Sequence, residues 1–236
     1  MEKIDIIYED QELLVVCKPA GVLVHPTPAN EPDTVVAWFL AKFPETKNLS
    51  WPDATRAGIV HRLDKDTSGL MILAKNPEKL AELQAKFKER DVQKTYQALV
   101  VGKTPEKGTV EAAIVRDGQN DKQKVQETVY SFTKGTVRPA KTDYKTIKYF
   151  TFEDETLSLI ECYPHTGRMH QIRVHMKYSG FPLIGDQFYS TKLSNKLSKD
   201  LNLDRQFLHA VKLEIDGKTF ESQLASDLQT VLTKLS

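Results

Sequence analysis

Short apolar runs, separated by turn-forming residues, are the feature that most constrains the fold of this 236-residue chain. Alternating apolar and polar residues predict two hairpins, formed by residues 144–152 with 156–164 and by residues 207–215 with 218–224. The Asp216-Gly217 pair is a favoured turn for the second hairpin. Further strands are predicted at 4–10, 12–18, 58–63, 69–75, 95–102, 108–115 and 126–132.

Helices are fewer in the predicted pattern and have recognisable ends. Asn76, Pro77 and Glu78 are typical of a helix start, with a capping side chain, a proline at the first position and an acid in the first turn. Gly180 is typical of a helix end. Helices are predicted at 35–43, after Asn76, at 168–180 and at 227–235. The pattern therefore predicts an α+β fold, a single domain over residues 1–236 with a mixed, mainly antiparallel sheet.

Composition excludes several classes of protein. The 33 basic and 32 acidic residues give a net charge of +1, which argues against a protein that coats nucleic acid by bulk attraction but allows one basic face. A signal-peptide pattern and a run of about 20 apolar residues are both missing, so we expect a cytoplasmic protein. The two cysteines, Cys17 and Cys162, lie in apolar strand-like segments and are predicted to be reduced and buried.

The sequence motifs give little support for a metal site or a nucleotide-binding site. His170 and His175 are five residues apart, whereas a zinc pair on one helix face needs a spacing of four. The sequence has neither a phosphate-binding glycine loop nor a dinucleotide-binding one, and neither cysteine lies in a nucleophile motif. We therefore predict no metal and no cofactor. Carboxylate and arginine chemistry remain.

One carboxylate lies where chemistry is plausible. Asp64 follows a candidate strand, and a nucleophilic carboxylate must stay ionised while partly desolvated. A neighbouring guanidinium favours the ionised form. Arg62 is two residues away, and Arg168 and Arg173 are more distant alternatives. Asp66 competes for the role, although its KDTSG context favours a turn. From residue types alone, a structural turn and a nucleophile both remain open for Asp64.

The stretch around Asp64 also carries a family signature. Residues 61–70, HRLDKDTSGL, resemble the HRLDxxTSGL motif of the RluA-type RNA pseudouridine synthases. KPAGVLVHP at 18–26 and KTYQA at 94–98 resemble that family's KPxGxxxHP and KxYxA motifs. PHTGRMHQIRVH at 164–175, with GFPLIGD at 180–186, resembles its TGRxHQIRVH and GxPxxGD elements. The motifs occur in the family's order and cover nearly the whole chain.

This resemblance implies a fold and a reaction. The fold is that of the pseudouridine synthases, with a bent sheet flanked by helices. The reaction is the isomerisation of a uridine in RNA to pseudouridine, without metal or cofactor. Asp64 corresponds to the nucleophile, which attacks either the anomeric carbon of the sugar or carbon six of the uracil. The sequence leaves both points of attack open.

The resemblance also assigns roles to other residues. Tyr96 corresponds to a tyrosine that packs on the target base, its alternative being a buried strand residue. Arg168 corresponds to the arginine that pairs with Asp64, its alternative being a phosphate or solvent contact. Arg62 would fill the gap left by the flipped-out uridine, its alternative being a plain ion pair with Asp64. Weaker candidates for RNA or substrate contact are His61, Lys75, His170 and Arg173.

Substrate choice is predicted from what the chain lacks. Many family members carry a small RNA-binding module before the catalytic domain, whereas here the first motif begins at Lys18. We therefore expect a catalytic domain without that module, which acts as a monomer. Basic residues in segments 86–94 and 119–148 would then select the RNA. A compact stem-loop of ribosomal or transfer RNA is the expected substrate.

Two other hypotheses are weaker. A glycoside hydrolase needs two carboxyl groups flanking the bond, and Asp66 is poorly placed to be the partner of Asp64. The glycoside hydrolase hypothesis also leaves the other motifs without a role. A catalytically inactive RNA-binding module would retain the fold, but Asp64, Tyr96 and Arg168 are all present. Tritium release from uridine labelled at its fifth carbon would separate the three hypotheses.

Overall fold

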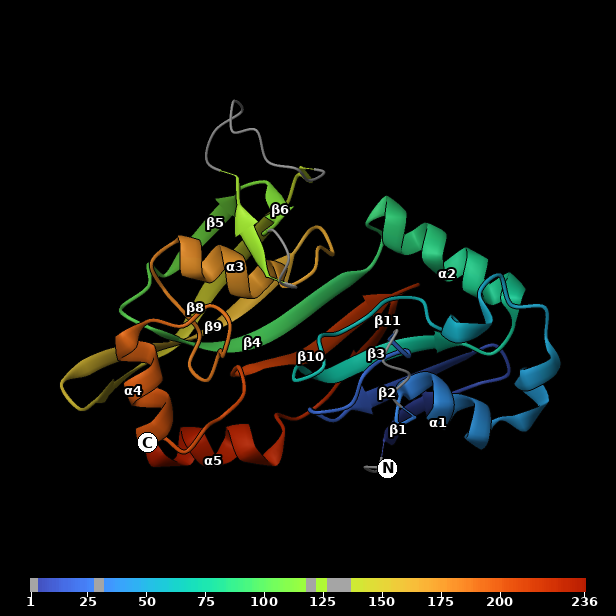
Figure 1. Ribbon diagram of the computed structural model, residues 1–236, viewed down its shortest axis with the longest axis horizontal. Helices are drawn as coiled ribbons and strands as arrows, with labels where there is room; N and C mark the ends of the chain where they lie inside the picture. Colours follow the sequence, from blue (N-terminus) through green and yellow to red (C-terminus); the bar gives the residue numbers. More distant parts are fainter. Residues whose placement is uncertain (1–3, 28–31, 118–121, 127–136) are drawn as a thin grey trace. The chain divides into compact units, whose positions relative to one another are not determined.

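The chain clusters into two compact units. The computed structural model describes residues 4–27, 32–117, 122–126 and 137–236 (Figure 1). The first unit contains Met1–Gln93 and Ala210–Ala225, and the second contains Lys94–His209 and Ser226–Ser236. The grouping of residues 1–236 into one domain therefore stays a prediction.

The first unit is built on a sheet whose strands run in the order β1-β2-β3-β10-β11. These strands are β1 (Asp5–Glu9), β2 (Leu13–Lys18), β3 (Ser68–Ala74), β10 (Leu208–Ile215) and β11 (Lys218–Glu221). β2 pairs antiparallel with β3, and Leu14 lies opposite Leu73. Every residue of β3 is buried, which explains why it reads as a continuous apolar run instead of an alternating one. This strand follows directly after the loop that carries Asp64.

Helices α1 (Val35–Lys42) and α2 (Pro77–Glu89) belong to the first unit, together with the 3₁₀ turns η1 (Pro44–Asn48) and η2 (Ala54–Arg56). The predicted start of α2 is confirmed, because the Asn76 side chain accepts a hydrogen bond from the Lys79 N–H at 2.7 Å. α2 contacts β3 and presents Leu80 and Leu83 as its buried residues.

The prediction of a strand at 58–63 is wrong. Ile59 forms only an isolated bridge with Leu73, and the Ala74 N–H donates to the Gly58 carbonyl at 2.9 Å. The reason is that β2 and β10 occupy the two edges of β3, so no edge remains for a full third partner. Gly58 permits the close approach at the strand end, since a Cβ there would lie 2.7 Å from the Ala74 carbonyl oxygen.

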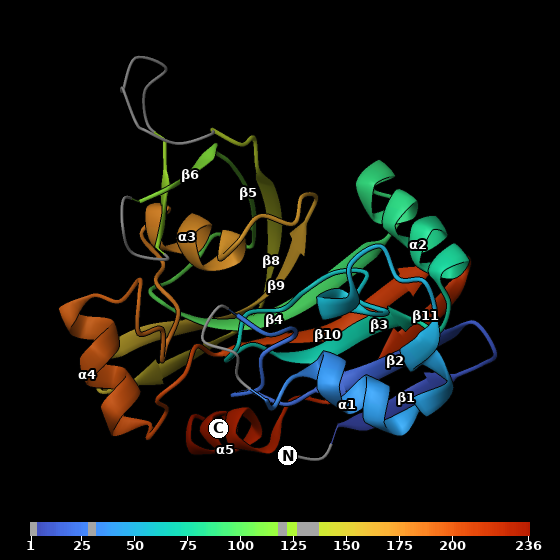
Figure 2. The same ribbon diagram turned by 45° about the vertical axis from the view of Figure 1, so that its right-hand side comes forward.

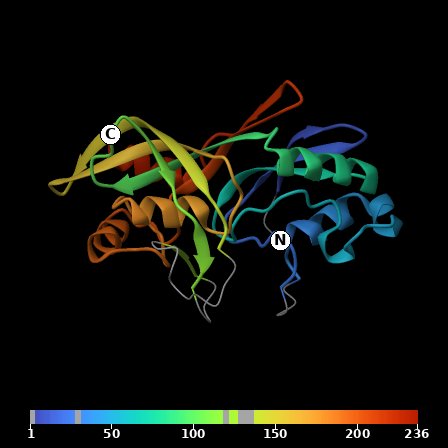
Figure 3. The ribbon, with the colours of Figure 1, turned by 90° about the horizontal axis from the view of Figure 1, so that it is seen from above.

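The second unit contains an antiparallel sheet in the order β4-β9-β8-β5, followed in Figure 2. Its strands are β4 (Gln93–Val101), β5 (Lys107–Glu111), β8 (Lys141–Phe152) and β9 (Glu155–Pro164). The long β8–β9 hairpin was predicted from its alternation and is confirmed (Figure 3). Its turn residues Glu153 and Asp154 both have positive φ. β6 (Ile114–Arg116) and β7 (Gln123–Val125) form a separate two-stranded ribbon.

The strand predicted at 108–115 is divided between β5 and β6, and the strand predicted at 126–132 lies almost entirely outside the described residues. α3 (Gln171–Tyr178) is shorter than predicted at its start, because His170 adopts a left-handed conformation with φ of 57°. Its predicted end is confirmed by Gly180, with φ of +85°. α3 contacts β7, β8 and β9.

α4 (Lys192–Asp200) was not predicted, although Thr191 and Ser194 form a capping box at its start. α5 (Ser226–Lys234) confirms the predicted terminal helix. Among the helices in the described part of the chain, none is long and apolar enough to cross a membrane.

Candidate active site

The loop that carries Asp64 is fastened to the first motif by a buried lysine. Lys18 is 0% exposed, and its Nζ donates to the carbonyl oxygens of Pro19 at 2.8 Å, Val22 at 2.9 Å and Lys65 at 2.8 Å. The Gly21 N–H also donates to the Lys65 carbonyl, at 3.0 Å. The carbonyl of Lys65, one residue after Asp64, is therefore held by two donors, from Lys18 and Gly21. The sequence pattern does not predict this contact, although Lys18 lies within the first motif.

A turn that begins at Asp64 closes the same loop. The Asp64 carbonyl accepts a hydrogen bond from the Thr67 N–H at 3.1 Å, and Thr67 is buried. Gly69 then brings β3 against β10, because a Cβ at Gly69 would lie 2.4 Å from the backbone of Ala210. The half-buried Asp64 thus lies at the start of a backbone segment that is constrained by the turn and by the Lys65 contacts. The turn predicted in the KDTSG context is found one to two residues earlier, at 64–67, because Ser68 and Gly69 already belong to β3.

Arg62 contacts the histidine of the first motif. Its Nη1 lies 3.3 Å from Nε2 of His25, while His25 Nδ1 lies 3.0 Å from the Pro26 carbonyl oxygen. A neutral imidazole that donates from Nδ1 can accept from Arg62 at Nε2. Burial lowers the pKa of His25, and the nearby charges of Arg62 and Arg56 lower it further, so the neutral ring is favoured. The two motifs are therefore joined by side chains as well as by backbone.

A pocket of about 360 Å³ opens beside this contact. Its walls combine apolar side chains with two arginines, two histidines, one acid and one amide. Arg56 lies 3.6 Å from Asp53 and is more than half exposed. Guanidinium groups at an exposed rim suit phosphate oxygens. The lining residues are His25, Pro52, Asp53, Arg56, Ile59, Val60, His61, Arg62, Leu80 and Gln84.

His61 and Lys75 make contacts within the first unit. The His61 ring stacks on Phe87 at 4.6 Å, and its Nε2 accepts a hydrogen bond from the Ile72 N–H at 3.2 Å. Lys75 Nζ donates to Glu9 Oε1 at 2.7 Å and to the Asp10 carbonyl oxygen at 2.9 Å. These contacts give both residues a structural role within the first unit. Their predicted contact with substrate remains a prediction.

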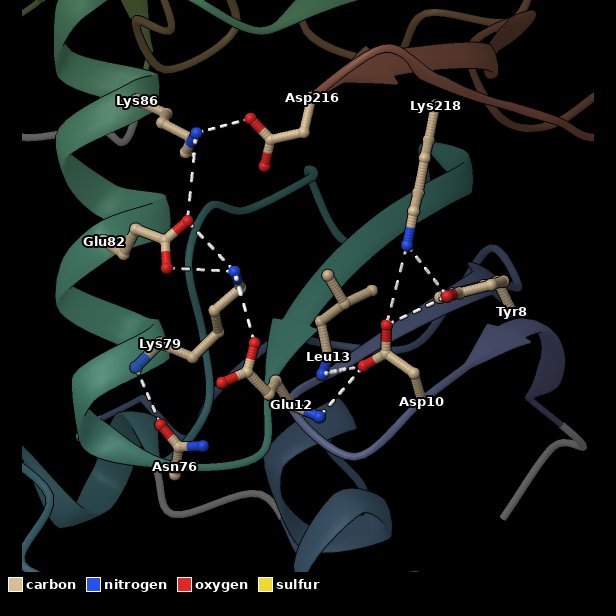
Figure 4. A network of polar contacts seen from close by, with 10 residues as sticks. All are labelled: Tyr8, Asp10, Glu12, Leu13, Asn76, Lys79, Glu82, Lys86, Asp216 and Lys218. Atoms are coloured by element: carbon tan, nitrogen blue, oxygen red, sulfur yellow. Dashed lines mark hydrogen bonds and ion pairs between the residues drawn. The ribbon is translucent and has the colours of Figure 1, made fainter.

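The basic segment 86–94 is partly neutralised by acids (Figure 4). Lys86 forms an ion pair with Asp216 and lies 3.8 Å from Glu82. Burial lowers the pKa of Lys94, at the other end of the segment. Most of the segment lies in or just after α2 instead of in a loop. Of the second predicted basic segment, 119–148, residues 119–121 and 127–136 lie outside the described part of the chain.

Tyr96 lies on β4 in the second unit, opposite Cys162 of β9. Its side chain is 9% exposed, which suits the buried-strand alternative and leaves its predicted role untested.

Burial raises the pKa of both Cys17 and Cys162, so the two thiols stay protonated at neutral pH. Both cysteines are free, and Cys162 is buried as predicted, whereas Cys17 is only half-buried.

Arg168 lies in the loop before α3. Its Nε donates to the Pro139 carbonyl oxygen at 3.3 Å, and its backbone N–H donates to Gln171 Oε1 at 3.1 Å. The same oxygen accepts from the Thr166 hydroxyl at 2.6 Å, and the Gln171 amide donates to the Lys141 carbonyl oxygen at 2.9 Å. Gln171 thus holds the loop that positions Arg168. Sequence reasoning did not single out Gln171.

Arg173 forms a buried ion pair. It is 3% exposed, and its Nε and Nη2 donate to the two oxygens of Asp186 at 2.7 and 2.9 Å. His170 Nδ1 lies 2.8 Å from the Tyr189 hydroxyl oxygen. These contacts give both residues a structural role within the second unit. Their predicted contact with RNA or substrate is not tested by them.

His175, the other histidine considered for a zinc pair, has a hydrogen-bond partner at each ring nitrogen. His175 Nδ1 lies 2.9 Å from the Thr142 hydroxyl oxygen, and its Nε2 lies 3.0 Å from the Ala112 carbonyl oxygen. Burial lowers its pKa, so the neutral ring is favoured. Within the described residues, no group of three or more histidine, cysteine or acidic side chains is arranged to hold a metal ion.

Comparison with known proteins shows to which class of protein this chain belongs. The family model of RNA pseudouridylate synthase matches residues 12–178. An uncharacterized RNA pseudouridine synthase of Chloroflexus aurantiacus is 40% identical over 224 residues, which cover 92% of this chain and 65% of the relative. Ribosomal large subunit pseudouridine synthase D of Pseudomonas aeruginosa is 37% identical over 247 residues, with 99% and 72% covered.

Solved structures agree. Human RNA pseudouridylate synthase domain containing 4 matches with a TM-score of 0.74 and 26% identity, over 98% of this chain and 92% of that one. Human RNA pseudouridylate synthase domain containing 1 shares the fold, with a TM-score of 0.71 and 24% identity over 99% and 95%. This chain belongs to the RNA pseudouridylate synthase family, a family of isomerases. The predicted family, fold class and enzyme class are confirmed.

Proposed function

We propose that this chain isomerises a uridine of structured RNA to pseudouridine, with Asp64 as the nucleophile. The observation that carries the proposal is the constrained backbone of Asp64 and the residues after it, held by Lys18 and Gly21 at the Lys65 carbonyl and by the turn from Asp64 to Thr67. A nucleophile on a fixed backbone loses little entropy when it meets its target. The adjoining pocket supplies guanidinium groups for the RNA phosphates.

The reaction balances without a co-reactant. The bond between N1 of uracil and the anomeric carbon breaks, and a bond from carbon five to the anomeric carbon forms. Carbon five loses a proton, and N1 gains one. Asp64 attacks either the anomeric carbon or carbon six, and in both cases it leaves unchanged at the end. No metal or cofactor is needed for this balance.

The supporting roles come from the resemblance. Arg62 would replace the flipped base in its stack and would have to leave its contact with His25 to do so. Tyr96 would pack on the uracil, and Arg168 would pair with Asp64 and keep it ionised. The proposal also keeps the monomeric state and the cytoplasmic location predicted from the sequence.

Ribosomal RNA is the favoured substrate, because several relatives are named for the large ribosomal subunit. Transfer RNA is the second candidate. The chain spans 65% of the first relative and 72% of the second, so the substrate of those longer proteins is carried over here only as a proposal.

Tritium release tests both parts of the proposal. Large-subunit ribosomal RNA and transfer RNA, each labelled at carbon five of uridine and free of pseudouridine, would be incubated with the chain. We expect release from the ribosomal RNA, and a loss of at least about a thousandfold in Asp64→Asn because the nucleophile is removed. Asp66→Asn is the matched control and should retain most of the rate.

Two outcomes would contradict the proposal. Equal losses in Asp64→Asn and Asp66→Asn would show that the loop needs both carboxylates only for its shape. RNA binding without release in the wild-type chain would favour the non-catalytic RNA-binding module. Release from transfer RNA alone would keep the reaction and change the substrate.

A further inference from the structure

An exposed phenylalanine stands on the loop that follows the last signature motif. Phe188 is 48% exposed, although a phenylalanine side chain gains substantially from burial. A single exposed apolar residue is ordinary on a protein surface and needs no explanation by itself.

The backbone of Phe188 is fixed by a buried carboxylate. Asp186 is 1% exposed, and its Oδ1 accepts from the N–H groups of Phe188 at 2.9 Å and Tyr189 at 3.0 Å. Both oxygens of Asp186 also accept from Arg173. A buried bidentate ion pair is thus used to hold the peptide that presents an exposed ring. Such an arrangement reduces the entropy lost when a ligand meets the ring.

The start of the same loop is equally constrained. The Gly185 N–H donates to the Ser198 hydroxyl at 2.7 Å, and a Cβ at Gly185 would lie 1.8 Å from the Arg205 carbonyl oxygen. No other residue fits there without moving the backbone. The loop therefore presents Phe188 from a fixed position.

The surroundings of the ring are aromatic and cationic. The His170 ring lies nearly parallel to it, with the centroids 5.7 Å apart and 24° between the planes. Lys122 Nζ lies 5.8 Å and Arg173 Cζ lies 5.4 Å from the Phe188 centroid. Arg173 is buried and paired with Asp186, so the half-buried Lys122 is the cation near the ring that a phosphate can reach. A flat apolar ring next to such a lysine is complementary to a nucleobase and its phosphate, because the base stacks while the lysine attracts the phosphate.

We propose that Phe188 is a stacking platform for an unpaired base of the RNA, distinct from the uridine that reacts. The inference rests on RNA being the substrate, as proposed above. Stacking on an aromatic ring tolerates any base, so Phe188 would add affinity for unpaired strands without selecting a sequence. An apolar protein partner is the competing occupant, and the test includes it.

The test compares three variants in the full chain. Phe188→Ala removes the platform, and Phe188→Trp restores it with a larger ring. Tyr178→Ala is the matched control, because Tyr178 is a 51% exposed aromatic residue at the far end of α3. Thermal unfolding of each variant checks that it is folded. Tritium release gives KM and kcat, and fluorescence anisotropy gives the Kd for a single-stranded oligouridylate.

Phe188→Ala should raise KM and the oligouridylate Kd by about 5- to 100-fold, the range expected for one stacked base, and leave kcat nearly unchanged. Phe188→Trp should restore both constants, and oligouridylate should quench the introduced indole. Tyr178→Ala should stay within about twofold of wild type. An abasic oligonucleotide of the same length should bind wild type and Phe188→Ala equally, because it retains the phosphates and lacks the bases.

An unchanged KM and Kd in Phe188→Ala would overturn the inference, and so would an equal loss of affinity for the abasic strand. Self-association of wild type that Phe188→Ala abolishes, with RNA binding unchanged, would assign the ring to a protein contact. Failure of the proposed function is seen separately, as absent tritium release in wild type. Weakened oligouridylate binding in Phe188→Ala would then still support the platform.

Discussion

Two buried cations hold two loops of this chain in different ways. In the first unit Lys18 is 0% exposed and donates to three backbone carbonyl oxygens, one of them that of Lys65 next to Asp64. In the second unit Arg173 is 3% exposed and donates to the carboxylate of Asp186. Each cation lies in a signature motif, and each fixes a peptide that presents a half-buried or exposed side chain.

The difference between the two loops lies in what remains when the cation is removed. Without Arg173, a buried carboxylate loses its counter-charge, which is among the most costly defects in a protein interior. Without Lys18, three neutral carbonyl groups lose a donor, and a neutral group without this partner is a smaller defect than an unpaired buried charge. We therefore expect the second unit to lose more stability, and the Asp64 loop to lose more activity.

The largest expected effect is that of Arg173→Met. It should lower the free energy of unfolding by about 3–5 kcal/mol, because it strands the buried charge of Asp186. Urea denaturation, with the midpoint and slope fitted separately, measures this loss. Arg173→Lys keeps the charge but not the two parallel hydrogen bonds and should recover only part of it. A loss below about 1 kcal/mol would show that the ion pair does not hold the loop.

A smaller loss of stability should follow from Lys18→Met. Three carbonyl groups lose one donor each, and we expect about 2 kcal/mol. Tritium release should fall by about 10- to 100-fold in kcat, because the peptide next to Asp64 is no longer fixed. Lys65→Met is the control, since it removes an exposed side chain and keeps the carbonyl that Lys18 binds. A Lys18→Met variant that lost stability without losing kcat would show that the hydrogen bonds of Lys18 stabilise the fold but do not contribute to the reaction.

The smallest effect is a difference in pH dependence between the loops. Burial opposes ionisation of Asp186, but the hydrogen bonds and charge of Arg173, with two loop N–H groups, lower its pKa overall. A lowered pKa contributes stability that is present above the unfolded value of about 3.9 and is lost as the pH falls through the folded value. The advantage of wild type over Asp186→Asn should therefore shrink in acid.

Urea midpoints measured between pH 7 and pH 3 would show this change. Over the same range the difference between wild type and Lys18→Met should stay constant, because carbonyl groups do not titrate. A parallel decline of both differences would mean that the acid sensitivity comes from elsewhere in the protein.

Local sequence signals predicted the elements of the fold better than the contacts of the site. The Asn76 cap, the β8–β9 hairpin and the Gly180 helix end were all predictable, because each depends on neighbouring residues. The strand at 58–63 was wrong because the edges of β3 were already occupied, which the local pattern does not record.

The buried cations were missed for a related reason. Lysine is rarely fully buried, so Lys18 in a motif reads as a surface or substrate residue until its carbonyl partners are known. The pairing of Arg173 with Asp186 joins residues 13 positions apart, on a helix and on a loop. The motif that resembles the family named both residues but not their partnership.

The carbonyl oxygen of Lys65 accepts two hydrogen bonds, so the backbone conformation at this position does not depend on the identity of the side chain. Both hydrogen bonds that fix the peptide go to its oxygen atom, while the side chain is exposed to solvent. Almost any amino acid supplies the same oxygen. The position is therefore open to drift in evolution, and a spectroscopic label attached there would sit one residue from Asp64 without loosening the backbone that holds it.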